Sequence, residues 1–413
     1  MTITSTVRAR TLEAGAALSR AADWLAVAVA VSLPWSTTAT GILVAVWLVV
    51  VLLTLDAAAV RRELLTAAGG LPVLLWALAA VGLLWADASW SERLAGFGSF
   101  NRLLIIPLLL AQFRRSDRGI NVLFGFLISA TGVLFFSWLL VLFPGLPLRT
   151  TSAGVPVKDY ILQSGEFLMC GFALLALAFE PARSGRWRLV AGLLALAVLF
   201  FADIAIVATA RTTLLVAPVF ALLLGWRQFH WKGVVGAAIL FGVLGVGVVI
   251  ESPYLLARLD TSVNELHAYE SDGGVNSTGL HLELLKKSIS IVRTAPLIGH
   301  GTGSIQQQFR NAAEGRSGIS SIVGPNPHSQ ILNVAIQLGF VGAAVLLAMW
   351  GAHFMLFRGA TLAAWIGLLV VTDNVVSSLF SSHLFDFTQA WLYVFGVGVA
   401  GGMVQRERRA PQS

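Results

Sequence analysis

The chain has 413 residues, of which 57% are apolar and only 12% are charged, and its mean hydropathy is +0.80. Soluble globular domains carry about 45–50% apolar and about 25% charged residues, so this composition excludes a soluble globular protein. Several apolar runs approach the roughly 20 residues that cross a hydrocarbon core. We therefore expect an all-α polytopic membrane protein. The formal net charge of +7 is no argument for nucleic-acid binding until the basic residues are placed.

The cysteine content and the N-terminal residues exclude two further features. Cys170 is the one cysteine, so no intramolecular disulfide can form, and no cysteine motif for zinc or haem occurs. The apolar segment that follows Arg8, Arg10 and Arg20 lacks a small-residue cleavage site. We therefore expect no cleavable signal peptide.

Apolar segments of membrane-spanning character recur along the whole chain. They are residues 21–33, 41–56, 71–85, 101–113, 119–143, 159–179, 187–207, 212–226, 233–250, 329–357, 360–380 and 387–404. The pair 187–207 and 212–226 is too long for a single crossing, and Ala210-Arg211-Thr212 is the expected turn. We predict about twelve transmembrane helices: nine in residues 1–250 and three in residues 328–413, which end in a cytoplasmic tail. One large loop, residues 251–327, separates the two sets.

The basic residues alternate between the connections in a way that predicts orientation. When the N-terminus is placed in the cytoplasm, most Lys and Arg residues fall in the inside segments. Both termini are therefore expected in the cytoplasm, and residues 251–327 on the outer side. The basic residues mark topology beside anionic lipid, and nucleic acid is not an expected partner. The short outer connections hold only Arg93, Arg102, Arg149, Lys158 and Arg211.

The outer loop contains a predicted amphipathic helix. Apolar residues recur at helical spacing from about Thr278, and Pro296 ends the pattern. Such a helix lies on a membrane surface or covers a cavity. The apolar positions are Leu282, Leu285, Ile289 and Val292. The next stretch, residues 299–303 (Gly-His-Gly-Thr-Gly), follows a helix and lacks the Lys-Ser/Thr ending of a nucleotide phosphate loop. We interpret it as a turn that needs positive φ angles.

The stretch Pro325-Asn326-Pro327-His328-Ser329-Gln330 closes the loop and opens an apolar helix that runs to about Trp350. Prolines fit just before a helix or in its first turn, so His328 is predicted at a helix N-terminus at the membrane edge. The helix dipole disfavours an imidazolium there, which makes a neutral His328 a candidate general base. A capping or interfacial histidine is the alternative. Gly339 and Gly342 are expected to permit close helix packing lower down.

Basic residues on the outer side are candidates for binding an anion. Arg211 lies between two apolar spans, and its planar guanidinium suits phosphate oxygens, although a topological or snorkelling arginine is the alternative. Arg293 is similar but lies in the polar loop. Arg102 and Lys158 lie at the outer ends of spans and would add positive field.

Supporting polar residues flank the candidate base. Ser329, Asn333 and Gln337 recur every four positions, and interhelical hydrogen bonding is the favoured interpretation for Asn333 and Gln337. The last outer turn contains a second candidate histidine, His383, and a carboxylate, Asp386. Three roles are open for Asp386: to orient a base, to hold an arginine or to cap the final helix. No metal or other cofactor is expected, because the loop histidines lack ligand spacing. Those histidines are His267, His281 and His300.

Three motifs, in this order and topology, resemble the O-antigen ligase and polymerase superfamily. Ala210-Arg211-Thr-Thr-Leu-Leu resembles its Ser-Arg-(Ser/Thr)-Ala-Leu-Leu segment. The stretch Arg293-Thr-Ala-Pro-Leu-Ile-Gly-His-Gly-Thr-Gly-Ser resembles its Pro-Leu-x-Gly-x-Gly-x-Gly segment. His328-Ser-Gln-x-Leu, followed by Gly-Phe-Val-Gly, resembles its His-Asn-x-x-Leu…Gly-x-x-Gly signature, with Ser329 in place of the commoner Asn.

The resemblance implies metal-independent transfer of a glycan from undecaprenyl pyrophosphate on the periplasmic face of the bacterial inner membrane. It implies that Arg211, Arg293 and His328 are essential, with Asp386 a weaker match. Our interpretation is a ligase that moves O-antigen to the lipid A-core oligosaccharide with inversion, with His328 as the base and the arginines neutralising the pyrophosphate.

Other functions remain open at this stage. An O-antigen polymerase and a protein O-oligosaccharyltransferase are the close alternatives. A membrane transporter is the alternative of another class, and against it the sequence shows no inverted repeat and no matched pair of broken helices.

Overall fold

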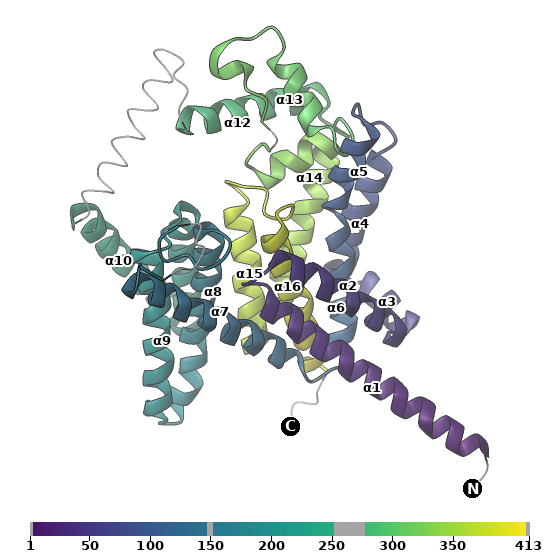
Figure 1. Cartoon of the computed structure of the whole chain (residues 1–413), viewed down its shortest axis with the longest axis vertical. Helices are drawn as coiled ribbons and strands as arrows, with labels where there is room; N and C mark the ends of the chain where they lie inside the picture. Colours follow the sequence, from purple (N-terminus) through teal and green to yellow (C-terminus); the bar gives the residue numbers. More distant parts are fainter. Residues whose placement is uncertain (1–2, 147–151, 252–276, 325, 410–413) are drawn as a thin grey trace.

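The structure is a computed structural model of the chain, and it describes residues 3–146, 152–251, 277–324 and 326–409. Within these ranges the long elements are all helices, and the only β feature is an isolated bridge between Ser152 and Val155 (Figure 1). The predicted all-α class is therefore confirmed. Arg149, His267 and Pro325 lie outside the described residues.

The helices before the outer loop are α1 (Ile3–Ser32), α2 (Thr37–Thr54), α3 (Ala57–Leu64), α4 (Ala67–Gly82), α5 (Trp90–Gly98), η1 (Asn101–Leu104), α6 (Ile105–Phe113), α7 (Gly119–Leu142), α8 (Tyr160–Arg183), α9 (Trp187–Ile206) and α10 (Arg211–Glu251). The later ones are α12 (Ser277–Thr294), α13 (Ile305–Ala313), η2 (Gly318–Ser321), α14 (Gln330–Leu356), α15 (Leu362–Ser377) and α16 (Phe387–Glu407).

In the described part of the chain, nine helical segments are long and apolar enough to cross a membrane. A tenth span forms if α3 and α4, which meet at 85°, act together, and α15 is apolar but has only 16 residues. α10 is broken at His230 (φ 53°, ψ −142°), where the backbones of Gly225 and Gly233 approach closely. Each predicted span falls in a helix. The predicted total of twelve is reached only if the α3–α4 pair, α15 and each half of α10 are all counted as spans.

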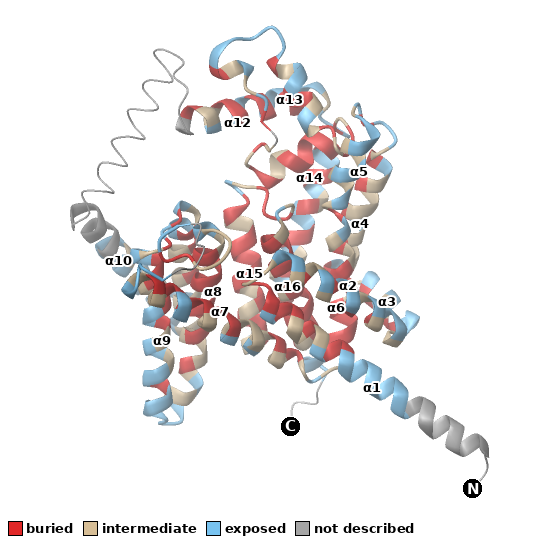
Figure 2. Cartoon of the chain, viewed as in Figure 1, coloured by how far each residue is buried: buried red, intermediate tan, exposed pale blue. Residues whose placement is uncertain are grey.

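The described helices contain two hydrophobic cores, and α14 contributes to both. The larger core lies in the helix bundle, where α16 is the most buried span (Figure 2). A smaller core joins α12, α13 and α14 above the bundle; its buried members are Leu284, Ile291, Val292, Phe309, Ala335, Ile336 and Ala343. We call α12, α13, η2 and their connecting loops the cap. The cap is therefore a folded unit that shares its core with α14.

The predicted helix in the cap is present as α12, and its predicted apolar positions are only partly buried within the protein. Leu285 and Ile289 are 40% and 38% exposed, whereas Glu283 and Lys287 are buried. The charged pair can be buried because Glu283 accepts a hydrogen bond from Ser320 Oγ (2.8 Å) and Lys287 Nζ donates to the carbonyl oxygen of Ile322 (2.9 Å). Hydrogen-bond partners in the loop after α13 therefore allow α12 to bury two charged residues, which the apolar pattern alone does not predict.

α14 is broken at Gly339 (φ 63°, ψ −162°), where the sequence predicted only close packing. The segment 296–303 inserts into this break. The N–H of Phe340 donates to the carbonyl oxygen of Pro296 (2.7 Å), and the N–H of Val341 donates to that of Leu297 (3.2 Å). In the opposite direction, the N–H groups of His300 and Gly301 donate to the carbonyl oxygens of Ile336 (2.8 Å) and Gln337 (2.9 Å). The inserted segment therefore satisfies backbone groups that the break leaves without helical partners.

The glycines of the inserted segment make this close approach possible. Gly299, Gly301 and Gly303 have φ angles of 68°, 87° and 86°, which confirms the predicted turn with positive φ. A Cβ atom on Gly299 would lie 2.5 Å from the carbonyl carbon of Gln337. Glycine is therefore required for space as well as for conformation.

We predict that Gly339→Ala destabilises the protein, because the backbone at this position is accessible to glycine alone and the new Cβ would meet the carbonyl oxygen of Leu297. The loss should be roughly 1–3 kcal/mol, seen as a lower thermal midpoint in detergent. Gly351→Ala, in the same helix and with open space around the new Cβ, is the control and should be neutral. Equal thermal midpoints for the two variants would show that the break does not require glycine at position 339.

Candidate functional site

His328 lies at the start of α14, as the prolines predicted, next to the N-cap residue Ser329. Its backbone has a positive φ of 53°, which is uncommon for a residue with a side chain. Its N–H donates to Asn326 Oδ1 (3.0 Å), which also accepts a hydrogen bond from Ser382 Oγ (2.7 Å). Asn326 therefore ties the His328 backbone to the loop between α15 and α16.

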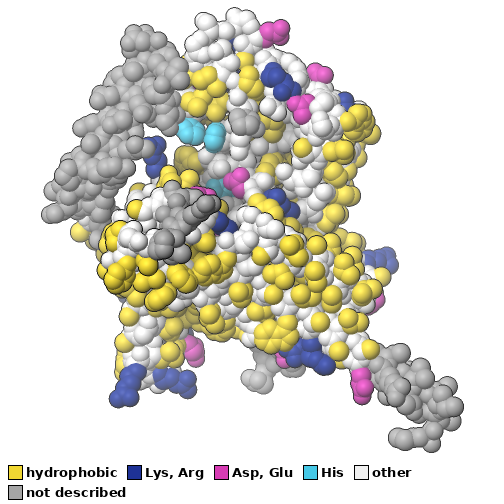
Figure 3. Space-filling model, in the orientation of Figure 1, with side chains coloured by type: hydrophobic (Ala, Val, Ile, Leu, Met, Phe, Trp, Pro, Cys, Tyr) yellow, Lys and Arg dark blue, Asp and Glu magenta, His cyan; other side chains and the backbone are white. Residues whose placement is uncertain are grey.

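The imidazole of His328 is half-buried and packs against the exposed ring of His281 on α12, with centroids 4.6 Å apart and planes at 77°. Within the described chain, the ring nitrogens of His328 have no hydrogen-bond partner. Burial, and secondly the neighbouring His281, lower the pKa of His328 below its usual 6.5. Figure 3 shows histidine side chains opening onto the space between cap and bundle. His328 is thus a neutral, accessible imidazole near pH 7.

Asn333 and Gln337 carry hydrogen bonds between elements, which was the favoured interpretation of these residues. Asn333 Nδ2 donates to Ser382 Oγ (3.1 Å), and Gln337 Nε2 donates to Asn333 Oδ1 (2.8 Å). The N–H of Gly303 donates to Gln337 Oε1 (2.8 Å). With Asn326, these groups form a continuous polar chain from the inserted segment to His328. Ser329, also buried, makes no side-chain capping bond.

His383 is buried in the loop between α15 and α16, and the pKa of its ring is lowered to about 4, mainly by burial and against a hydrogen bond with Gln389. It is therefore neutral and shielded from water. The neighbouring N–H of Leu384 donates to Gln330 Oε1 (3.0 Å), and the N–H of Gln330 donates to the carbonyl oxygen of Ser378 (2.9 Å). This loop supports the start of α14.

Arg102 and Asp386 lie together at the start of α16. Arg102 Nη1 donates to the carbonyl oxygen of Asp386 (2.9 Å), and its guanidinium stacks over the rings of Phe387 and Trp391 at 5.3 and 5.9 Å. Asp386 occupies the N-cap position of α16, but its side chain makes no capping bond. Burial raises the pKa of Asp386, and the charge of Arg102 opposes this. Of the predicted roles of Asp386, proximity to an arginine is the one the geometry favours.

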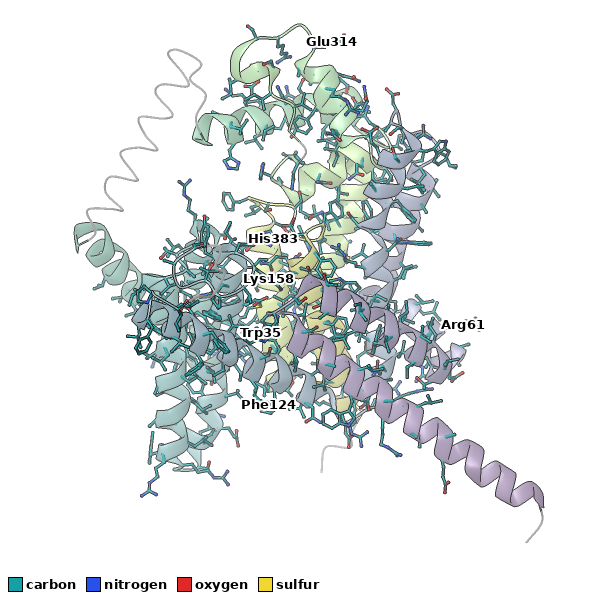
Figure 4. All side chains as sticks on the ribbon, in the orientation of Figure 1. Trp35, Arg61, Phe124, Lys158, Glu314 and His383 are labelled. Atoms are coloured by element: carbon teal, nitrogen blue, oxygen red, sulfur yellow. The ribbon has the colours of Figure 1, made fainter. Side chains whose placement is uncertain are left out.

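Lys158 reaches the same turn of α16 from the other side. Its ammonium donates to the carbonyl oxygen of Leu33 and to Thr388 Oγ1 (3.1 Å), and it forms an ion pair with Glu166 (3.9 Å). Burial lowers its pKa. Figure 4 labels both Lys158 and His383 below the cap. Lys158 and Arg102 therefore both have partners within the protein, and a donor contact for either remains a prediction.

Arg211 and Arg293 differ from these two cations. Arg211 begins α10 and Arg293 lies in the last turn of α12, and both are exposed. Neither guanidinium forms a hydrogen bond or ion pair with the described residues. Arg293 follows His281 by twelve residues on one helix, about 18 Å along its axis, so the structure does not bring Arg293 beside His328. Binding of an anion by either arginine stays a prediction.

Two residues of this site were missed by the sequence reasoning. Asn326 was part of the Asn-Pro stretch that we singled out, and its capacity to bond a backbone N–H two residues on was the available signal. His281 gave no local signal, because its contact with His328 joins residues that are far apart in the chain.

Residues 195–347 match the family model described as O-antigen ligase. The match extends from α9 into α14 and includes Arg211, Arg293 and His328. No curated protein matches the chain. This match supports the resemblance found from the three motifs: the chain is a multi-pass membrane protein with a segment of the O-antigen ligase type. The match likewise supports a function of the O-antigen ligase or polymerase type in lipopolysaccharide biosynthesis.

No cluster of three or more His, Cys, Asp or Glu side chains suited to a metal occurs among the residues that the structure describes. Metal independence itself stays a prediction.

We predict that Asn326→Leu lowers stability by about 1–3 kcal/mol, because it removes the acceptor for the His328 N–H and the Ser382 hydroxyl. Asn326→Asp keeps an oxygen at the same position and should remain close to wild type. Thermal midpoints in one detergent test this. If the leucine and aspartate variants melt together with the wild type, Asn326 does not secure the start of α14.

Proposed function

We propose that the protein is an inverting, metal-independent glycosyltransferase of the ligase type. It would transfer O-antigen glycan from undecaprenyl pyrophosphate to the lipid A-core oligosaccharide. The observation that carries the proposal is a neutral imidazole at the start of α14, whose ring nitrogens have no hydrogen-bond partner among the described residues, inside a segment that matches the O-antigen ligase family. The exposed Arg211 and Arg293, which likewise have no ion-pair partner in the described part of the chain, would supply the positive charge that a departing pyrophosphate needs.

The proposed reaction is a single displacement. A sugar hydroxyl of the acceptor loses its proton to a ring nitrogen of His328, and its oxygen attacks the anomeric carbon of the donor. The bond between that carbon and the pyrophosphate oxygen breaks, and the pyrophosphate leaves with the electron pair. Attack opposite the leaving group inverts the anomeric configuration. Arg211 would bind the leaving pyrophosphate, with Arg293 acting on a more distant part of the bound donor.

We also propose the location of the site. Residues 1–250 and 328–413 would cross the inner membrane, with both termini in the cytoplasm and residues 251–327 in the periplasm. The basic loop between α8 and α9, with Arg183 and Arg186, supports this orientation. A lipid-linked donor suits such a site, because the cytoplasmic nucleotide sugars are absent there.

Two helices, α10 and α14, are broken, where the sequence showed no matched pair of broken helices, and the two breaks do not favour a transporter. The break at Gly339 is filled by the chain's own backbone, and the break at His230 is a close turn between two helices. Broken helices of transporters instead leave backbone groups open to a substrate or ion.

The purified protein in vesicles tests the proposal. Undecaprenyl-pyrophosphate-linked glycan is supplied with lipid A-core or with a second molecule of the donor. Glycan on lipid A-core supports the ligase, and glycan joined only to the second donor identifies a polymerase. Movement of the donor across the membrane without any transfer would reject both and favour a transporter.

We predict that His328→Ala and His328→Gln both lose transfer by about 10²–10⁴-fold, because glutamine can bond the acceptor hydroxyl but cannot take its proton. Donor binding should persist, because the arginines remain. Since the pKa of His328 is lowered, wild-type transfer should hold to below pH 6.5 and then fall as the ring becomes protonated. Substantial transfer by the glutamine variant would reduce His328 to a positioning group.

We predict that Arg211→Lys lowers transfer about tenfold or more, since lysine keeps the charge but loses the bidentate fork, and one charge-assisted hydrogen bond contributes ~1.5–3 kcal/mol. Arg188→Lys is the matched control: Arg188 is exposed in the first turn of α9, next to the loop assigned to the cytoplasm, and its replacement should be silent. Wild-type rates for both variants, at equal expression, would make Arg211 a topology marker only.

We predict that Ser317→Cys, exposed before η2, reacts with a membrane-impermeant maleimide in intact cells after the outer membrane has been made permeable. Ser184→Cys, exposed between α8 and α9, should react only after the inner membrane is opened. The native Cys170 is buried and gives the background. The reverse labelling pattern would overturn the proposed orientation.

A further inference from the structure

The close contact between His281 and His328 joins two different elements of the cap and the bundle. His281 lies in the second turn of α12, whereas His328 precedes α14, and their rings meet edge to face at 4.6 Å. Such a contact favours one orientation of the half-buried His328 ring. It also places a second titratable group beside the candidate base.

Other interactions hold each side of this contact. α12 is fixed by the hydrogen bonds of Glu283 and Lys287 to the loop after α13, and Leu284 belongs to the smaller core. On the other side, Asn326 fixes the His328 backbone. Other parts of the fold therefore hold the two backbone segments that carry the rings.

We propose, on the basis of the proposed function, that His281 is a positioning residue for the transfer reaction. Its ring holds the His328 imidazole edge-on and keeps it free of a second proton, so that it can accept one from the acceptor hydroxyl. His281 itself does not touch the reacting atoms.

The physical basis is repulsion between two protonated rings. A positive charge on His281 at this separation disfavours a positive charge on the His328 ring. The lowered pKa of His328, with burial as the larger cause and His281 as the second, agrees with this.

Other charged groups on the neighbouring elements are directed elsewhere. In the α15–α16 loop, His383 is buried against Gln389, and Asp386 lies beside Arg102. α14 has no titratable side chain between Gln330 and Trp350. On α12, the charges of Glu283 and Lys287 lie on the buried face, and Lys286 lies about 140° around the axis from His281. In the described chain, His281 is therefore the titratable group that acts most directly on His328.

The test measures the protonation of His328 directly, in the purified full-length protein. Diethyl pyrocarbonate acylates the neutral imidazole, so the rate of modification at His328, followed by peptide mass spectrometry between about pH 5 and about pH 8, reports its titration. His281→Phe keeps a ring without a charge and should raise the midpoint by about half a pH unit, whereas His281→Lys should lower it by a similar amount. His300→Gln, which removes another histidine of the cap, should leave the midpoint unchanged.

The pH below which glycan transfer falls should shift in each His281 variant in the same direction as the midpoint of His328 modification. Unchanged midpoints in both His281 variants, with transfer intact, would overturn the role of His281 while leaving the proposed function standing. Opposite shifts of the midpoint in a protein that transfers no glycan would support the coupling of the two rings and overturn the proposed function.

Discussion

The architecture depends on one backbone junction, the insertion of segment 296–303 into the break of α14 at Gly339. The break removes helical partners from backbone groups on both sides, and the inserted segment replaces them with hydrogen bonds in both directions. A buried backbone group without a partner costs free energy comparable to a lost hydrogen bond, so the break and the inserted turn stabilise each other. Because the inserted segment directly follows α12, the junction also attaches the cap to the bundle.

The junction and the candidate base are connected by side-chain hydrogen bonds. Gly303 bonds to Gln337, which bonds to Asn333, and Ser382 continues the chain to Asn326 and thus to the His328 backbone. The same polar residues that were costly to bury therefore orient the site, because their groups in this chain are paired. Arg102 and Lys158 serve a similar structural purpose at the start of α16, where both bind groups of the protein.

The sequence predicted those features that depend on local chemistry. Apolar run length gave the helices, prolines gave the position of His328, and glycine spacing gave the positive φ angles at residues 299–303. It failed where distant segments decide the outcome. The buried face of α12 depends on partners after α13, the break at Gly339 on the inserted segment, and the His281–His328 contact on how the cap packs. The partners of Lys158 and Arg102 were likewise beyond local patterns.

We propose that the neutral imidazole of His328 and the exposed guanidinium of Arg211, both in the segment that matches the O-antigen ligase family, act on one donor molecule. The donor would then lie between Arg211 and His328. A cryo-electron microscopy structure with undecaprenyl pyrophosphate bound in a lipid nanodisc tests this most directly. We predict phosphate density within hydrogen-bonding distance of the Arg211 guanidinium, with the terminal phosphate facing the His328 ring. Density at the start of α16, against Arg102 and Lys158 and away from Arg211, would contradict the account.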